Sequence, residues 1–169
     1  MIETEDIKYM RLALEEAEKA FDKGEVPVGA VLIRQGELLT RGHNLKETMG
    51  DATSHAEIIA LQKACHQVGG WRLTESTLYV TLEPCPMCAG ALLQARVERL
   101  VYGAHDPKAG AVHSLYQLLN DDRLNHRLQV ESGLLAEECG EILKRFFRSR
   151  RKEPREPDSL KGESNTFQP

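Results

Sequence analysis

The chain has 169 residues, 41% of them hydrophobic and 28% charged, and its formal net charge is -4 at pH 7. This length provides for about one domain with a substantial single core. The polar N-terminus has no apolar stretch of the kind that a secretory signal needs, and no segment is long and apolar enough to span a membrane. We therefore expect a cytoplasmic protein, in which cysteines outside a metal site, here Cys65 and Cys139, are buried free thiols.

The first half of the chain predicts a helix, a hairpin and a second helix. Apolar residues at the spacing of an amphipathic helix recur before Gly24 and again before Gly69-Gly70. Between them, two short apolar runs flank the turn sequence Gln35-Gly36. The expected elements are helices over 6–22 and 54–68, strands over 28–33 and 38–42, and a polar loop over 45–53.

The second half predicts a strand, a helix, another strand and a terminal helix. A strand, a helix and a strand in succession imply a parallel crossover within one sheet. The terminal helix ends in a basic run, and the proline-containing stretch after it is typical of a flexible tail. The expected elements are strands over 77–82, 99–104 and 128–131, helices over 84–95 and from 134 onward, a surface loop over 105–114, a helical turn over 115–119, a folded domain over 1–152 and a tail over 153–169.

Cys85 and Cys88 stand three residues apart at the predicted start of a helix. Pro86 suits the first helical position, and the spacing puts both thiols on one face of the helix. The unpaired amides and the positive end of the helix dipole lower the pKa of a thiol there, toward the thiolate that zinc binds. The two cysteines are therefore candidate zinc ligands.

His55 and Glu57 begin the helix predicted over 54–68. Inside a helix two residues at this spacing point in opposite directions, but side chains at a helix start lean toward its N-terminus. With Thr53 or Ser54 as the N-cap, both side chains can reach one space beyond the helix end. His55 can then bind a metal there while Glu57 transfers protons.

Together, His55, Cys85 and Cys88 give three protein ligands, which is the pattern of a catalytic zinc site with an open position for water. Zinc lowers the pKa of such a water, and Glu57 is the candidate for carrying its proton. A Cys-x-x-Cys pair taken alone also fits a four-ligand structural zinc site or a redox pair. The His-x-Glu and Pro-Cys-x-x-Cys patterns together match nucleobase deaminases.

Five blocks of sequence carry a wider resemblance, and the zinc motif accounts for two of them. With these blocks the chain resembles the bacterial tRNA-specific adenosine deaminases over residues 5–151. The zinc motif alone is shared with cytosine, cytidine, guanine and riboflavin-pathway deaminases, so the distinction depends on the other blocks and on the basic terminal helix. The blocks are GEVPVGAV at 24–31, GHN at 42–44, ATSHAEI at 52–58, TLEPCPMCAGA at 81–91 and GAHDPKAGA at 103–111.

This resemblance implies an α/β protein with the three-layer α/β/α cytidine-deaminase-like fold and a central mixed sheet of about five strands. It also implies a homodimer with one zinc ion per subunit. The implied reaction is the hydrolytic conversion of the wobble adenosine of a tRNA anticodon to inosine, with the anticodon stem-loop as the RNA partner. Water activated at zinc attacks C6 of an adenine that has left its stack, and Glu57 moves the protons.

The resemblance also assigns substrate contacts. Asn44 matches the asparagine that contacts the base in the family, although the local pattern taken alone favours a turn-forming asparagine. Val26 and Pro27 match the wall of the base pocket. Three further residues fall in a loop that resembles the family's anticodon-contacting loop, namely His105, Asp106 and Lys108.

The predicted terminal helix carries six positive residues within positions 144–152 and no acidic residue among them, although the whole chain is negative. Such a local reversal of charge indicates a polyanionic partner, while a solvated helix end is the alternative. Phe146 and Phe147 are adjacent and cannot both face the core, so we expect at least one to be buried. The residues expected to contact RNA are Phe147, Arg148, Arg150 and Arg151.

Two other classes of protein fit part of the pattern. A small-molecule deaminase, above all a guanine deaminase, has the zinc motif but no need of a basic helix. A zinc-stabilised RNA-binding module without catalysis leaves Glu57 and the missing fourth ligand unexplained. The sequence therefore favours an RNA-acting deaminase.

Overall fold

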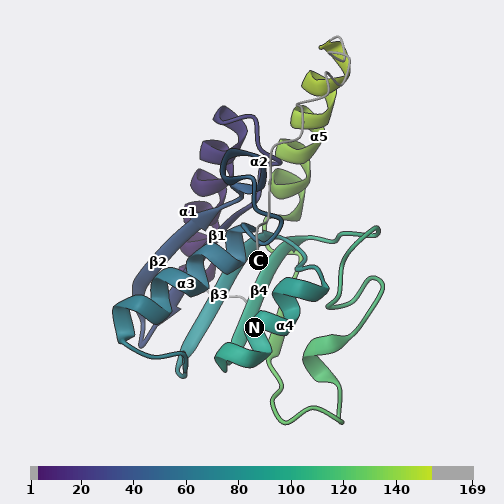
Figure 1. Ribbon diagram of the computed structural model, residues 1–169. Coiled ribbons are helices and arrows are strands. Elements are labelled where there is room, and N and C mark those ends of the chain that lie inside the picture. Colours follow the sequence, from purple (N-terminus) through teal and green to yellow (C-terminus); the bar gives the residue numbers. More distant parts are fainter. Residues whose placement is uncertain (1–3, 154–169) are drawn as a thin grey trace, which may run out of the picture.

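The computed structural model describes residues 4–153, which form one mixed β-sheet with helices on both faces (Figure 1). The strand order is β2-β1-β3-β4-β5. β1 is antiparallel to both of its neighbours, whereas β3, β4 and β5 run parallel to one another. The predicted mixed sheet and the parallel crossover through the cysteine helix are both present. The strands are β1 (Gly29–Arg34), β2 (Glu37–His43), β3 (Ser76–Leu82), β4 (Arg99–Ala104) and β5 (Gln129–Ser132).

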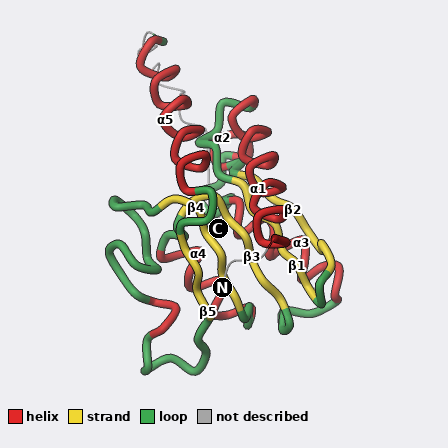
Figure 2. Tube along the Cα trace, turned by 180° about the vertical axis from the view of Figure 1, so that it is seen from behind, coloured by secondary structure: helices red, strands yellow, loops and turns green. Residues whose placement is uncertain are grey.

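Helices α1 and α5 cover one face of the sheet, and α3 and α4 cover the other, as the front and back views show (Figures 1 and 2). This three-layer α/β/α arrangement is the one that the family resemblance implies. The C-terminal end of α5 projects beyond the rest of the molecule (Figure 1). The helices are α1 (Thr4–Asp22), α2 (Lys46–Met49), α3 (Ala56–Val68), α4 (Pro86–Ala95) and α5 (Ala136–Lys152), with a 3-10 turn η1 (Leu118–Asn120) before β5.

The central strands are buried on both faces because their apolar residues are continuous rather than alternating. Along β1, Val31 and Ile33 pack with α1 in one core cluster, while Ala30 and Leu32 pack with α3 and α4 in the other. Successive side chains of a strand point to opposite faces, so a continuous apolar run supplies both cores. The strand predicted over 28–33 is buried in this way.

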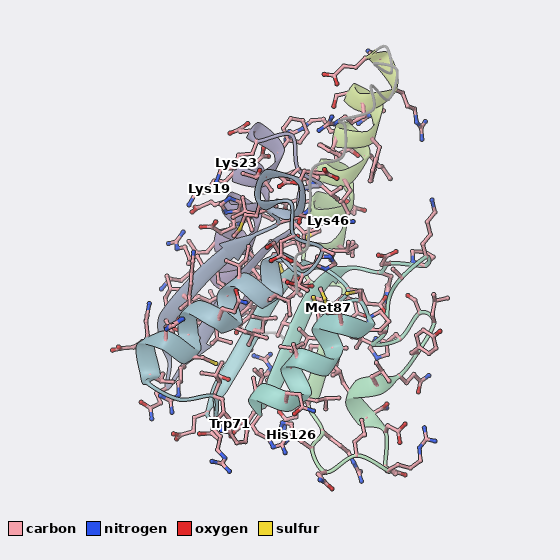
Figure 3. All side chains as sticks on the ribbon, viewed as in Figure 1. Lys19, Lys23, Lys46, Trp71, Met87 and His126 are labelled. Atoms are coloured by element: carbon pink, nitrogen blue, oxygen red, sulfur yellow. The ribbon has the colours of Figure 1, made fainter. Side chains whose placement is uncertain are left out.

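The two helices that carry the candidate ligands both begin at the same end of the sheet. Close packing positions α3 there, because a Cβ atom on Gly42 of β2 would clash with the backbone oxygen of Ala56 in the first turn of α3. Met87, between the two cysteines, marks the start of α4, and Trp71 lies at the opposite end of this layer (Figure 3). A crevice at the carboxyl ends of parallel strands is where open α/β sheets bind their ligands.

The polar loop predicted over 45–53 contains the short helix α2. Its first amides, those of Glu47 and Thr48, donate hydrogen bonds of 2.9 Å each to the carboxylate of Glu25. Gly50 then ends the helix in the left-handed conformation, with φ 59°. The stabilising carboxylate is distant in sequence, so the local pattern did not reveal this helix.

The segment over 105–114 was predicted as a surface loop, and this is only partly right. It is irregular, but Gly110, Ala111 and Val112 in its middle are buried. The fold therefore holds this loop against the body of the protein.

The flexible tail predicted over 153–169 lies outside the described residues, apart from Glu153. Within residues 4–153, no helix combines the length and the hydropathy that crossing a membrane requires.

Candidate metal centre and substrate surface

Three predicted ligands come together at the N-terminal ends of α3 and α4. His55 Nδ1 lies 3.6 Å from Cys85 Sγ and 3.6 Å from Cys88 Sγ. All three ligand atoms lie within 4.8 Å of one another, and Cys88 is buried while the other two are half-buried. In the part of the chain that the structure describes, no other group of three histidine, cysteine or acidic residues is arranged so closely.

The donor set and its spacing fit a zinc ion. A nitrogen at ~2.05 Å and a sulfur at ~2.3 Å from one tetrahedral zinc ion lie ~3.6 Å apart. His55 Nδ1 has this separation from each cysteine sulfur. Since the protein supplies three ligands, a tetrahedral ion held here keeps one position open for water or substrate.

The ligands reach this point because two of them occupy N-cap positions. His55 is the N-cap of α3 and Cys85 is the N-cap of α4, and neither caps its helix through a side-chain hydrogen bond. The prediction that Thr53 or Ser54 caps α3 is wrong, because His55 is the N-cap and the hydroxyls of Thr53 and Ser54 donate instead to Asp51 Oδ1 and Met49 Sδ. With His55 itself at the cap, its imidazole extends past the helix end toward the two sulfurs.

Glu57 lies in the first turn of α3 and is 4% exposed. Burial raises the pKa of Glu57, and so does the negative charge of Cys85, while a hydrogen bond from the thiol of Cys88 opposes the shift. Glu57 is not one of the three ligands. A buried carboxyl group beside the ligands, with a raised pKa, has the properties of a proton carrier.

The two thiols and the imidazole of His55 shift one another's pKa values. Hydrogen bonds from Cys88 and from His55 lower the pKa of Cys85 to about 4. The hydrogen bond to Cys85 raises the pKa of His55, and the same neighbour together with burial raises the pKa of Cys88. A zinc ion bound here by two thiolates would require both thiols to lose their protons.

The residues matched to the base pocket also lie together. The side-chain amide of Asn44 donates to the backbone oxygen of Val26 at 3.1 Å, and its oxygen accepts from the amide of Lys46 at 3.1 Å. Pro27 is buried and Val26 is half-buried. Asn44 thus holds this wall and the start of α2 in place, which is the turn-forming role that the sequence left as the alternative. Contact of Asn44 with a base stays a prediction.

The three residues matched to the anticodon-contacting loop follow β4. His105 is exposed, with Nδ1 at 3.0 Å from the hydroxyl of Tyr102. The carboxylate of Asp106 accepts hydrogen bonds from the amides of Lys108 and Ala109, which shapes a turn. Lys108 is exposed. Contacts of these three residues with RNA stay predictions.

Four of the predicted RNA-contacting residues line one cavity of about 580 Å³ between this loop and α5. Phe147 is 46% exposed there, whereas Phe146 is 6% exposed and packs edge to face on Phe21. The expectation that at least one of the two phenylalanines is buried is confirmed. The cavity is lined by Lys108, Phe147, Arg150, Arg151 and Glu153.

The arginines of α5 differ in how they are held. Arg148 pairs with Glu141 at 2.6 Å, and Arg145 pairs with Glu18 at 2.8 Å and lies over the ring of Phe21. Arg150 donates to the backbone oxygen of Gly24. Within residues 4–153, Arg151 forms no ion pair. The basic run is thus partly neutralised by acidic residues that lie outside it in sequence.

Two buried carboxylates were missed by the sequence analysis, although both lie inside the quoted blocks. They are Glu25, 1% exposed, and Glu83, 2% exposed. Burial acts to raise the pKa of Glu83, but hydrogen bonds from Ser114 and from the amides of His113 and Asp106 lower it to about 2. Each of the two is a charged residue next to a buried strand, with no partner nearby in sequence. This was the signal in the sequence that could have identified them as buried.

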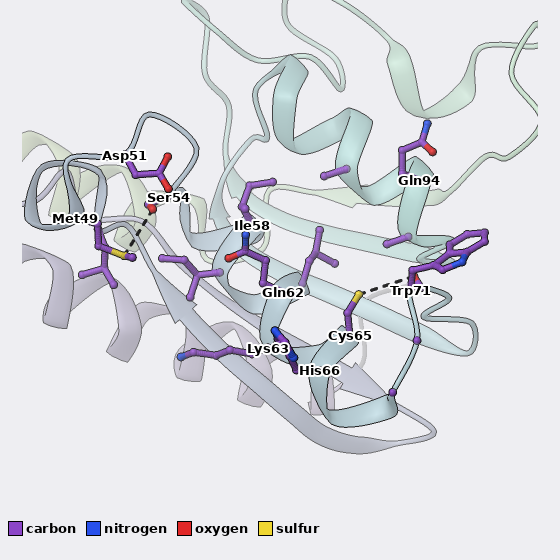
Figure 4. Close-up of a pocket in the computed structure, with 17 residues that line it drawn as sticks. Met49, Asp51, Ser54, Ile58, Gln62, Lys63, Cys65, His66, Trp71 and Gln94 are labelled. Atoms are coloured by element: carbon purple, nitrogen blue, oxygen red, sulfur yellow. Dashed lines mark hydrogen bonds between the residues drawn. The ribbon is translucent and has the colours of Figure 1, made fainter. Parts of the chain in front are cut away.

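A second, larger cavity of about 1420 Å³ lies along α3 and α4, away from the metal ligands (Figure 4). Ile58, Gln62 and Cys65 of α3 border it on one side, Gln94 of α4 on the other, and Trp71 at one end. Cys65 was predicted as a buried thiol, but it is only partly buried because it faces this groove; Cys139 is buried as predicted.

Known proteins resemble this chain over most of its length. The family model of MafB19-like deaminases matches residues 4–151. A tRNA-specific adenosine deaminase of Bacillus subtilis is 54% identical over 149 residues, which is 88% of this chain and 92% of that protein.

Solved structures show the same fold. One, from work on A-to-I editing by tRNA:A34 deaminases at the wobble position of transfer RNA, is 46% identical with a TM-score of 0.77, and the match covers 80% of this chain and 98% of that one. A guanine deaminase from Nitrosomonas europaea is 21% identical, with a TM-score of 0.72 and 83% of each chain covered. At that identity the second likeness bears on the fold alone.

Proposed function

Since the chain belongs to the family of tRNA-specific adenosine deaminases, we propose that it hydrolyses the wobble adenosine of a tRNA anticodon to inosine. The observation that carries the proposal is the approach of His55 Nδ1 to both cysteine sulfurs at 3.6 Å, with the buried Glu57 beside them. Membership of the family supports the choice of substrate.

His55, Cys85 and Cys88 would hold one zinc ion per subunit. Such an ion would supply Lewis-acid chemistry, lowering the pKa of the water that is to attack C6 of the adenine. Glu57 would accept a proton from the attacking water and deliver it to the ring nitrogen, and would then take the proton of the new C6 hydroxyl group and pass it to the departing amino group. The amino group leaves as ammonia and the water oxygen becomes the carbonyl oxygen of inosine.

The RNA is held by two groups of residues. Asn44, Val26 and Pro27 border the flipped base, and His105 and Asp106 belong to the loop on the other side of the site. The cavity lined by Lys108, Phe147, Arg150 and Arg151 combines cations with one exposed aromatic ring. Such a combination suits the phosphates and an unstacked base of an anticodon stem-loop.

A substrate comparison tests the proposed function. The protein, loaded with zinc, is incubated with an anticodon stem-loop containing adenosine at the wobble position, with the same stem-loop containing guanosine there, and with free guanine. We expect deamination, measured as release of ammonia, from the first substrate alone, with inosine as its product. Release of ammonia from free guanine, with the adenosine stem-loop unchanged, would show a free-base deaminase of the same fold.

This substrate places the enzyme in the cytoplasm, where tRNA is found. The four cysteines of the chain are all free, which agrees with a reducing compartment.

The predicted homodimer has a suitable surface in the groove along α3 and α4. The groove is bordered mainly by apolar side chains, including the half-exposed Trp71 and the exposed Met49. A large apolar surface of this kind marks an interaction site in a folded domain. The family resemblance supports a second copy of this chain as the partner.

Sedimentation equilibrium tests the dimer. We expect two chains per particle for the wild type and one for Ile58→Asp, because a charge would be buried at the interface. Leu38→Asp is the control, since Leu38 is an exposed apolar residue of β2 outside the groove, whereas Ile58 is partly buried in it. A dimer that survives Ile58→Asp would place the interface elsewhere.

A further inference from the structure

The carboxylate of Glu83 is saturated by hydrogen bonds from a single loop. Glu83 lies just after β3 and two residues before the ligand Cys85, and its side chain is fully buried. The loop that follows β4, residues 105–114, supplies the donors; we refer to it as the 105–114 loop. The donors to Oε1 are the amide of Asp106 at 3.1 Å and the hydroxyl of Ser114 at 2.5 Å, and those to Oε2 are the amides of Val112, His113 and Ser114 at 3.2, 2.9 and 2.9 Å.

Backbone contacts fasten the same two segments together. The amide of Ala111 donates to the oxygen of Pro84 at 2.9 Å, and the amide of Glu83 donates to the oxygen of Ala104 at 2.9 Å. The 105–114 loop is therefore docked on the short segment that leads into the metal ligands. Amides of the loop that do not reach water need hydrogen-bond acceptors. Removal of the Glu83 carboxylate would therefore leave several of these amides without an acceptor.

Gly110 shows how closely the loop approaches this carboxylate. A Cβ atom at Gly110 would clash with the carboxyl group of Glu83 and with the backbone oxygen of Asp106. The loop can therefore sit in this position only with glycine here. A substitution at Gly110 would displace the loop without changing any charge.

The loop held in this way carries Lys108, which shares a cavity with the exposed Phe147 and the cations of α5. Asp106, bound through its amide to Glu83, shapes the turn that contains Lys108. A chain of direct contacts thus leads from Glu83 to Asp106 and on to Lys108. Movement of the loop would change the distance between Lys108 and α5, while the metal ligands are held by their own helices.

We propose that Glu83 is a positioning residue for the RNA substrate, acting through the 105–114 loop to set Lys108 opposite the basic end of α5. Glu83 is not one of the three candidate metal ligands. This inference rests on the proposed function, since it assigns Glu83 to the binding of the stem-loop. Substitution of Glu83 should therefore weaken substrate binding and leave the chemical step unchanged.

The main test compares Glu83→Gln with wild type on the anticodon stem-loop. Glutamine keeps the shape but turns an NH₂ group toward the loop amides, so we expect KM to rise roughly 10-fold, with kcat and zinc content close to wild type. Glu37→Gln, the same change at an exposed carboxylate of β2, should leave KM unchanged. An unchanged KM in Glu83→Gln, or a fall in kcat that follows loss of zinc, would overturn the proposal.

A double-mutant cycle with Lys108→Ala separates positioning from general stability. If Glu83 acts through Lys108, the loss of stem-loop affinity on Lys108→Ala is large in the wild type and small in the Glu83→Gln background. Equal losses in both backgrounds would show that Glu83 has only a structural role. The wild-type arm tests the proposed function separately, because a wild-type protein inactive on the stem-loop would contradict that function rather than the role of Glu83.

Milder variants keep the test decisive if Glu83→Gln does not fold. Ser114→Ala removes one hydrogen bond to Glu83 and should raise KM by about 2- to 5-fold. Gly110→Ala should raise KM with an unchanged kcat, because it displaces the loop sterically. Normal KM values for both folded variants would also overturn the proposal.

Discussion

The metal centre and the basic end of α5 both gather charged groups, but they hold them differently. At the metal centre the side chains are short and partly or fully buried, and each is fixed at the start of a helix. On α5 the side chains are long and exposed, and Arg148 is more than half exposed even in its ion pair with Glu141. The first region depends on fixed geometry, and the second on net charge and adaptable contacts. Substitutions should therefore act steeply at the first region and gradually at the second.

Loss of a ligand should have the largest effect. Cys88→Ala leaves two protein ligands, so we expect loss of zinc and of all measurable deamination. Elemental analysis of the purified variant and an inosine assay measure both. Cys65→Ser is the matched control, because Cys65 is a free thiol that faces the groove along α3 and α4, and it should keep zinc. Full activity in Cys88→Ala would remove Cys88 from the site.

Glu57→Gln should separate metal binding from proton transfer. The amide has the shape of the carboxyl group but cannot carry the proton, so turnover should fall by about 10² to 10⁴-fold. Zinc content and the thermal unfolding midpoint should stay close to wild type, since Glu57 is not a ligand. Single-turnover deamination of the stem-loop, with zinc quantified in the same sample, makes the measurement. Near-normal turnover would assign proton transfer to another group.

The same contrast explains what the sequence could and could not predict. The ligands follow from spacing and helix-start patterns within a few residues, and the structure brings them together. The role of Thr53 or Ser54 as a cap was wrong because Asp51 binds the side chain of Thr53 instead. Short-range patterns therefore predicted the three metal ligands but assigned the N-cap of α3 to the wrong residue.

Contacts between distant segments account for the remaining differences. The helix α2 depends on Glu25, which is 22 residues before Glu47 in sequence. The buried middle of the 105–114 loop depends on Glu83, and Arg145 pairs with Glu18 across 127 residues. No local pattern contains such pairings, so the fold class could be predicted while these partners could not.

Neutralising Arg148, Arg150 and Arg151 together should have a moderate effect on binding and little effect on the metal. Each lost phosphate contact lowers the salt dependence of log K by about 0.7 for single-stranded RNA, so stem-loop affinity should fall most at low salt, with zinc unchanged. Exposed ion pairs contribute only about 0 to 1 kcal/mol to stability, so folding should be largely retained.

The matched control for this triple variant is Arg123→Gln with Arg127→Gln, because these exposed arginines also pair with acidic residues, Asp121 and Asp122, but lie outside α5. Stem-loop titrations at several salt concentrations compare the two variants with wild type. If the triple variant binds and deaminates like the wild type throughout, α5 is a solvated helix end and the RNA is held elsewhere.

The smallest expected effect distinguishes two adjacent rings of α5. Phe147→Ala should leave stability nearly unchanged because Phe147 is 46% exposed. If its ring stacks on an unpaired base, worth about 1 to 3 kcal/mol, stem-loop affinity should fall by roughly 5-fold or more. Phe146→Ala provides the contrast, since Phe146 is 6% exposed and packs on Phe21; it should destabilise the fold by about 3 to 5 kcal/mol. Chemical denaturation and stem-loop titration of both variants make the comparison. Equal affinity for wild type and Phe147→Ala would leave RNA binding at this end to the cations alone.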